Sequence, residues 1–102
     1  MSVSLQVIYP ASEGTSFDMD YYTSKHLPMV PDHIGAHIES AVVTKGVSGG
    51  PDTPAPYHAV ATLVFADEEA RNAAMAAIGP LVADIPNFTN VQPHLLFGDV
   101  AG

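Results

Sequence analysis

The segment YHAVATLVF, residues 57–65, decides the fold of this chain of 102 residues. It is rich in β-branched and aromatic residues, which favour β-strands. The stretch before it, SGGPDTPAP at residues 48–56, is rich in glycine and proline and predicts a turn or loop. We therefore predict a central strand over 57–65, with which other strands of the chain pair.

Three further strands are expected around it. Residues Val3 to Tyr9 alternate between two sides, as in a strand, and Pro10 is expected to end that strand. The segment AHIESAVVTKG, residues 36–46, has a polar and an apolar side and predicts a second strand. A last strand is expected over residues 89–97.

Two helices are expected between these strands. The first is predicted to run from Phe17 to about Leu27, because Pro28 disfavours helical geometry in the residue before it. The segment PMVPDHIG that follows is expected to break regular structure. The second helix is capped by Asp67 and has apolar residues at helical spacing as far as Leu81, with a kink or interruption at residues 79–80.

The resulting order is strand, helix, strand, strand, helix, strand, which predicts a single α+β domain over residues 1–102 with a ferredoxin-like βαββαβ topology. Both helices would cover one face of an antiparallel sheet. No further element remains to cover the other face, which alternation makes partly apolar. We therefore expect a homodimer that forms through this open sheet face.

Charge and composition exclude several classes of partner. The chain has 11 acidic residues against 3 basic ones, for a formal charge of -8. Nucleic acid and anionic membrane surfaces would be repelled, and a single arginine, Arg71, argues against a strongly anionic substrate. A neutral or weakly acidic, small, largely apolar organic ligand fits better.

The absence of cysteine removes disulfides, thiolate nucleophiles and cysteine-ligated metals. The segment MSVSLQVIYP has no basic residue and no long apolar run, so we expect neither a signal peptide nor a spanning helix, and a cytoplasmic location.

Five histidines raise the question of a metal site. His33 and His37 have the spacing of a ligand pair on a helix, but Gly35 lies between them and no glutamate or cysteine stands at supporting spacing. We expect neither a metal nor an organic cofactor. Metal-assisted chemistry through His33, His37, His58 or His94 stays as a third alternative.

His26 is the strongest candidate for chemistry. At about 100° per residue, one arc of the first helix gathers the residues Met19, Tyr22, Thr23, His26 and Leu27. This more apolar face should meet the sheet, so the imidazole of His26 would project inward one turn beyond Tyr22. Such a histidine is often only a packing residue, and the residues alone leave that alternative open.

The stretch YPASEGTSFDMDYYTSKHLPMV resembles the signature of the EthD family, and PAPYHAVATLVFADEEA is similar to the second half of that family. The resemblance covers nearly the whole chain. It implies a ferredoxin-like subunit that forms a dimeric α+β barrel. It also implies that His26 faces a small-molecule pocket and carries acid/base chemistry.

The family and its relatives of the same architecture include proteins linked to ether degradation, lactone isomerases, polyketide cyclases and cofactor-free oxygenases. We therefore expect a cofactor-free isomerase, cyclase or monooxygenase that acts on a small apolar oxygenated compound. His26 would be catalytic, and Tyr22, Met19, Thr23 and His58 would bind substrate. The alternative is a homodimeric binding or accessory protein that holds an apolar metabolite without transforming it.

Overall fold

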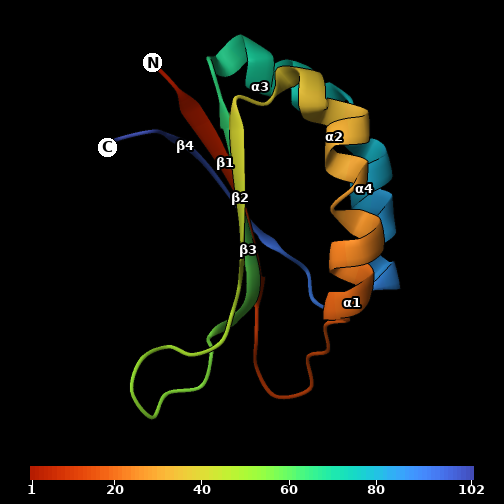
Figure 1. Cartoon of the computed structure of the whole chain (residues 1–102), viewed down its shortest axis with the longest axis vertical. Helices are drawn as coiled ribbons and strands as arrows, with labels where there is room; N and C mark the ends of the chain where they lie inside the picture. Colours follow the sequence, from red (N-terminus) through yellow and green to blue (C-terminus); the bar gives the residue numbers. More distant parts are fainter.

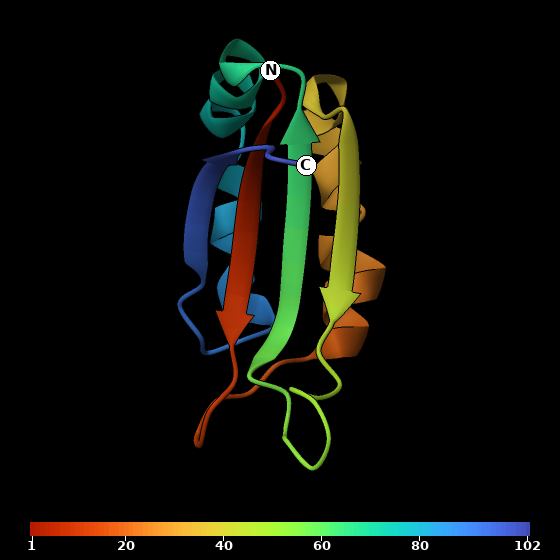
Figure 2. The same cartoon turned by 90° about the vertical axis from the view of Figure 1, so that its left-hand side faces the viewer.

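The computed structural model describes all 102 residues as one sheet with helices along one of its faces (Figure 1). The strands are β1 (Val3–Pro10), β2 (Ser40–Lys45), β3 (Tyr57–Phe65) and β4 (His94–Asp99). Neighbouring strands are antiparallel, and their order is β2-β3-β1-β4 (Figure 2). The predicted ferredoxin-like topology is confirmed, and β3 is one of its two central strands.

The helical layer consists of two arms. The first arm contains α1 (Met19–Tyr21), a π-helical turn (Tyr22–His26), α2 (Met29–Ile34) and a 3-10 turn (Gly35–His37). The second contains α3 (Glu68–Ala76), α4 (Gly79–Asp84) and a 3-10 turn (Ile85–Asn87). The interruption predicted at Gly79 is confirmed. None of these helices is long and apolar enough to cross a membrane.

The first helix ends at His26 with Leu27 as its C-cap, close to the predicted end at about Leu27. The prediction that PMVPDHIG breaks regular structure is wrong, because this segment contains α2. Leu27 and Pro28 both keep right-handed helical backbone angles, and α2 begins at the next residue. The π turn makes this possible, because the amide of Leu27 donates to the carbonyl of Tyr22 over five residues at 2.9 Å. Pro28 then stands at the N-cap of α2, where a missing N–H costs little.

Two strand boundaries also differ from the prediction. The strand predicted over 36–46 begins only at Ser40, because residues 35–37 form a 3-10 turn that continues the first arm. The strand predicted over 89–97 begins only at His94. The segment between Thr89 and Pro93 crosses instead from the helical layer back to the sheet (Figure 1).

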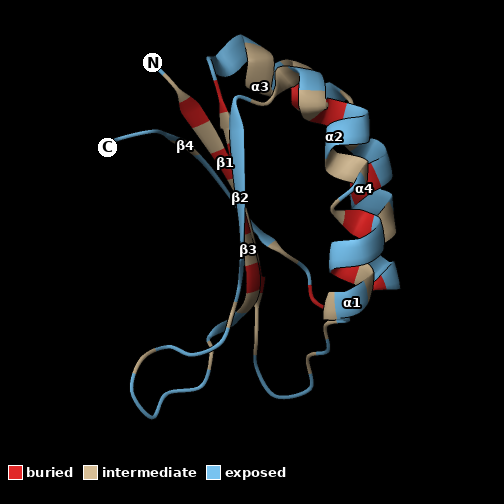
Figure 3. Ribbon diagram, viewed as in Figure 1, coloured by how far each residue is buried: buried red, intermediate tan, exposed pale blue.

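The core is divided into two clusters of buried side chains between the sheet and the helices. The upper cluster contains the residues Val3, Leu5, Ile34, Leu63, Phe65 and Ala74. The lower cluster contains Tyr9, Tyr22, Ala59 and Phe88. Figure 3 shows buried residues on β1, β3 and the helices, whereas β2 is exposed along its length.

No helix covers the other face of the sheet, which fills the foreground of Figure 2. Alternation from the buried positions places on it the apolar side chains of Ile8, Val42, Val60, Val64 and Leu96. Val42 and Leu96 are 64% and 54% exposed. Gln6 and Thr62 also lie there and hydrogen-bond each other at 3.1 Å.

Gly46, directly after β2, is expected to tolerate no side chain. A Cβ atom there would lie 1.9 Å from the carbonyl oxygen of Tyr57, which is backbone and cannot move freely. We expect Gly46→Ala to lower the free energy of unfolding by about 3 kcal/mol, measured by urea denaturation. Gly79→Ala is the control, because nothing lies within 4 Å of that position. Equal stability of the two variants would contradict the prediction.

Candidate functional site

A cavity of about 720 Å³ lies between the sheet and the helical arms. Its floor is one row of side chains that crosses all four strands in register: Val43, Ala61, Val7 and Leu95. Side chains of both helical arms form its roof, and residues 89–93 line one end. Of its 25 lining residues 18 are hydrophobic, so the cavity suits an apolar molecule.

The side chains of β3 explain why the cavity lies where it does. Leu63 and Phe65 fill the space under the helices in the upper half of the sheet. Ala59 and Ala61 stand at the corresponding positions of the lower half and reach much less far. Ala61 lines the cavity, whereas Ala59 packs in the lower cluster with Tyr9 and Tyr22, which bound the cavity on that side.

The π turn brings Tyr22 and His26 together in the cavity wall. Their rings stack with centroids 5.6 Å apart and planes inclined by 16°. The His26 ring also lies 4.6 Å from the ring of Phe88. Both side chains are buried, with His26 5% exposed. The structure thus places His26 inward and beside Tyr22, as the sequence predicts.

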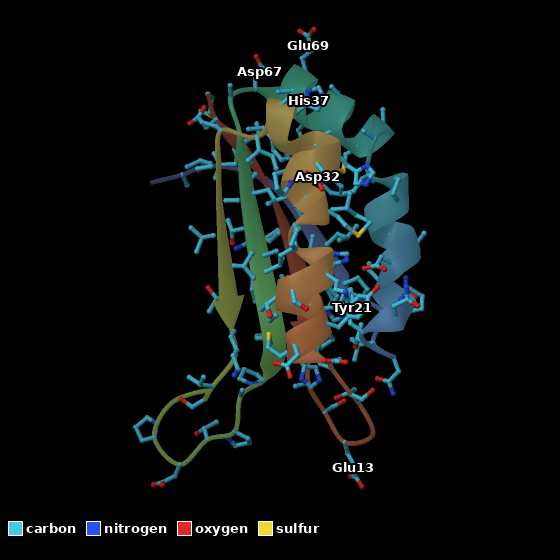
Figure 4. All side chains as sticks on the ribbon, turned by 45° about the vertical axis from the view of Figure 1, so that its right-hand side comes forward. Glu13, Tyr21, Asp32, His37, Asp67 and Glu69 are labelled. Atoms are coloured by element: carbon cyan, nitrogen blue, oxygen red, sulfur yellow. The ribbon has the colours of Figure 1, made fainter.

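Asp84 of α4 holds the other side of the imidazole. Its Oδ2 atom lies 2.9 Å from Nδ1 of His26. Its Oδ1 atom accepts hydrogen bonds from the hydroxyl of Tyr21 at 2.7 Å and from the amide of Asn87 at 2.9 Å. Figure 4 shows Tyr21 between α1 and α4, where it links the two helical arms.

The ionisation of Asp84 determines the tautomer of His26. Burial raises the pKa of Asp84, but hydrogen bonds from Asn87, His26 and Tyr21 lower it more, so its net pKa lies below the ordinary value of 3.8. An ionised carboxylate can only accept hydrogen bonds. Nδ1 of His26 must therefore carry a proton and donate it to Asp84.

The second ring nitrogen of His26, Nε2, is then available for chemistry. It has no hydrogen-bond partner in the protein. No fully buried polar side-chain atom lacks a partner, so Nε2 is in contact with accessible space. Because His26 lines the cavity, that space is the cavity. In neutral imidazole the lone pair of Nε2 faces an apolar chamber and can accept a proton.

Two tyrosine hydroxyls share this end of the cavity. Neither Tyr9 nor Tyr22, which are 2% and 1% exposed as whole residues, has a protein partner for its hydroxyl, so each hydroxyl is in contact with accessible space. Burial raises the pKa of Tyr22 to about 12. Burial also raises the pKa of Tyr9, and the neighbouring Tyr22 raises it further. Both phenols are therefore neutral donors at physiological pH.

The other residues expected to bind substrate lie outside the cavity wall. Met19 packs against the lower core cluster, and Thr23 is exposed, with its hydroxyl donating to the carbonyl oxygen of Met19 at 3.0 Å. The helical wheel misplaces Thr23 because a π turn contains more residues than an α turn. His58 stacks on Phe17 at 5.3 Å and lies 3.0 Å from the hydroxyl of Thr15.

The histidines considered for a metal site are not brought together. His33 and His37 lie on the first helical arm, His58 and His94 on different strands. Figure 4 shows His37 at the end of the molecule away from Tyr21 and the cavity's polar end. No group of three histidine, aspartate or glutamate side chains is placed to hold a metal ion.

Sequence reasoning missed Asp84 and Tyr9. The predicted second helix ended at Leu81, one turn before Asp84, and Asp84 is 58 residues away from its partner His26. Continuing the helical spacing for one more turn would have placed Asp84 beside Leu81 on the inward face. Tyr9 is the last residue of the strand predicted from Val3 to Tyr9, and nothing in the sequence marks its hydroxyl as unpartnered.

The unpartnered hydroxyl of Tyr22 leads to a prediction about stability. At pH 7, Tyr22→Phe is expected to change the free energy of unfolding by less than about 1 kcal/mol, because no hydrogen bond is lost. The raised pKa of Tyr22 contributes stability to the wild type, and this contribution should be fully present below pH 10.0, the pKa of an unfolded tyrosine. It should be lost as pH rises toward 12, because tyrosine ionises in the unfolded chain before it ionises in the folded one.

Tyr22→Phe should lack this component of the alkaline loss, which is on the order of 2 kcal/mol. Urea denaturation at several pH values measures it, with Tyr57→Phe as the control because Tyr57 is exposed. A loss of the same size in wild type and Tyr22→Phe would contradict the prediction.

Comparison with known proteins agrees with this architecture. An EthD-like protein from Ralstonia eutropha JMP134 superposes with a TM-score of 0.88 at 31% identity, covering 99% of this chain and 93% of that one. An ethyl tert-butyl ether D family protein from Bacillus halodurans C-125 superposes with a TM-score of 0.77 at 21% identity, covering 99% and 100%.

A third structure shares the fold at low identity. SnoaB from Streptomyces nogalater, a cofactor-independent oxygenase, superposes with a TM-score of 0.63 at 12% identity, covering 98% of this chain and 95% of that one. No curated protein matches the sequence. The EthD domain profile matches residues 13–92 and so includes the π turn, β3 and Asp84. The chain therefore belongs to the EthD domain family.

Proposed function

We propose that the protein is an enzyme that moves a proton at a carbon atom of a small, largely apolar, oxygenated compound, without an organic cofactor. His26 is the general acid/base. The observation that carries the proposal is the hydrogen bond from His26 Nδ1 to Asp84, which leaves Nε2 facing the cavity. An imidazole oriented in this way by a carboxylate is the arrangement that proton transfer needs.

The proposed step is balanced in atoms and in electrons, and no oxidant or reductant is needed. Nε2 of His26 takes a proton from a carbon next to a carbonyl group, and the C–H electron pair moves onto the carbonyl oxygen to form an enolate. The imidazolium that results is stabilised by the ionised Asp84 at 2.9 Å. Return of the proton to another carbon completes an isomerisation.

The composition of the cavity supports a substrate without charge. No lysine, arginine, aspartate or glutamate lines it, and the polar lining groups other than His26 are hydroxyls and amides. Because most of the wall is apolar, few lining groups hold water molecules that would compete for the enolate. Asp84 acts through His26 and is a positioning residue.

The relatives support the reaction class rather than one reaction. SnoaB is described as a cofactor-independent oxygenase. Isomerisation, cyclisation and oxygenation of a compound with an acidic C–H bond can each begin with the removal of that proton. A single base in an apolar cavity serves all three, and the proton transfer is the step they have in common.

The test uses β-tetralone, an uncharged carbon acid, and follows the loss of its α-proton NMR signal in deuterated buffer. His26→Ala is expected to lower the exchange rate catalysed by the protein about 100-fold or more. His33→Ala is the matched control, since His33 is exposed on α2. Asp84→Asn should lower kcat with KM unchanged, because the neutral amide no longer imposes one tautomer.

Two outcomes would contradict the proposal. Equal exchange rates in wild type and His26→Ala would show that His26 is not the base. Saturable binding of β-tetralone to the wild type, with no exchange above the buffer rate, would instead favour the binding or accessory protein.

The open sheet face supports a homodimer as the acting form. It presents the apolar side chains of Ile8, Val42, Val60, Val64 and Leu96 with no cover from this chain. Two copies that pack these faces together would bury them and give the α+β barrel that the family resemblance implies.

Leu96→Asp is expected to shift the protein from dimer to monomer in analytical ultracentrifugation, because it puts a charge into the buried face. Ala76→Asp, on exposed α3, is the control and should leave the dimer intact. A wild type that sediments as a monomer would contradict the prediction.

A further inference from the structure

The polar atoms of the cavity gather at one end. Tyr9 lies near the end of β1, and Tyr22 and His26 lie in the π turn of the first arm. The hydroxyls of the two tyrosines and Nε2 of His26 are side-chain atoms of the cavity wall with no partner in the protein. Each is therefore free to bind a polar group of a ligand.

The two tyrosines are arranged as a pair. Their rings lie with centroids 5.8 Å apart and planes inclined by 74°. Both hydroxyls are in contact with accessible space, because no fully buried side-chain oxygen lacks a partner. A ligand oxygen that accepts from both would gain two hydrogen bonds in a largely apolar wall. Tyr9 thus becomes a candidate ligand contact that the proposed proton transfer does not require.

The opposite end of the cavity is apolar. Leu5 of β1, Leu63 of β3 and Met75 of α3 line it, with Ile34 and Ile78 of the helical arms. Leu5 and Tyr9 are on the same face of β1, four residues apart, which is about 13 Å along an extended strand. The cavity is therefore long, with hydroxyls at one end and hydrocarbon at the other.

No charged carboxylate, lysine or arginine lines the cavity, and Asp84 approaches it only behind the ring of His26. Glu13, Asp67 and Glu69, labelled in Figure 4, point outward from a loop and from the start of α3. No lysine or arginine lines the cavity to neutralise a carboxylate or phosphate, and no carboxylate lines it to neutralise an amine. A charged ligand would lose its hydration without compensation.

We propose that the cavity binds an uncharged amphiphile in one orientation, with a phenol or carbonyl oxygen between the hydroxyls of Tyr9 and Tyr22 and an alkyl or aryl body that extends toward Met75. This inference rests on the proposed function, because it assigns the substrate class of the same site. In this orientation the carbon atoms next to the oxygen lie at the end of the cavity that contains His26.

The test measures the dissociation constants of para-alkylphenols, from propyl to heptyl, by isothermal titration calorimetry. Affinity is expected to rise about fourfold for each added methylene until the chain reaches Met75, and then to level off. An alkanoate of matched length is expected to bind at least tenfold more weakly than the phenol.

Matched variants test the two ends separately. Tyr9→Phe and Tyr22→Phe should each weaken binding about fivefold to tenfold, whereas Tyr57→Phe should leave it unchanged. Met75→Ala should move the levelling point to longer chains. Met29→Ala is its control, because Met29 is on the same layer but does not line the cavity. Thermal unfolding of every variant confirms that it is folded.

Affinity that does not depend on chain length would overturn the inference, as would equal binding of alkanoate and phenol. Unchanged affinity in both tyrosine variants would overturn the assigned orientation. Binding is measured without turnover and can be repeated in His26→Ala. Exchange that is unchanged in His26→Ala, with these binding trends intact, would therefore reject only the role of His26. Exchange that depends on His26, with these binding trends absent, would reject only the ligand class.

Discussion

The carboxylate of Asp84 is the point on which the site depends, because it joins the two helical arms at the lower end of the cavity. It accepts from His26 and Tyr21 of the first arm and from Asn87 at the end of the second. These contacts hold α4 at a set distance from the π turn. They also orient the imidazole and determine which of its nitrogens faces the cavity.

A carboxylate in this position is costly unless its oxygens are satisfied, because desolvation disfavours its charge. Three hydrogen bonds from named donors offset that cost and keep its pKa below the ordinary value. An apolar residue of similar size would pack between the arms without such a cost. The retained charge therefore determines the orientation and tautomer of His26 more directly than it stabilises the fold.

The extent to which sequence predicts this molecule follows from the range of the interactions. Alternation in β1 and β3 and the cap at Asp67 are local, and they predict the topology correctly. Helical spacing also predicts that His26 and Tyr22 point inward together. The continuation through Pro28 is not predictable from propensity, because it depends on a π turn that changes which amide meets which carbonyl. The His26–Asp84 contact joins residues 58 apart and has no periodic signal.

The four side chains of β3 that point toward the helices, Ala59, Ala61, Leu63 and Phe65, contribute both to the core and to the cavity wall. Leu63 and Phe65 belong to the upper core, and Leu63 also lines the cavity, whereas Ala61 lines the cavity and Ala59 packs in the lower cluster. All of them lie in one backbone hydrogen-bond ladder, which does not depend on side-chain size. Relatives with this fold can therefore reshape the cavity by exchanging the residue at the position of Ala61 while the hydrogen-bond ladder stays unchanged, so that the shape of the cavity can vary without a change of fold.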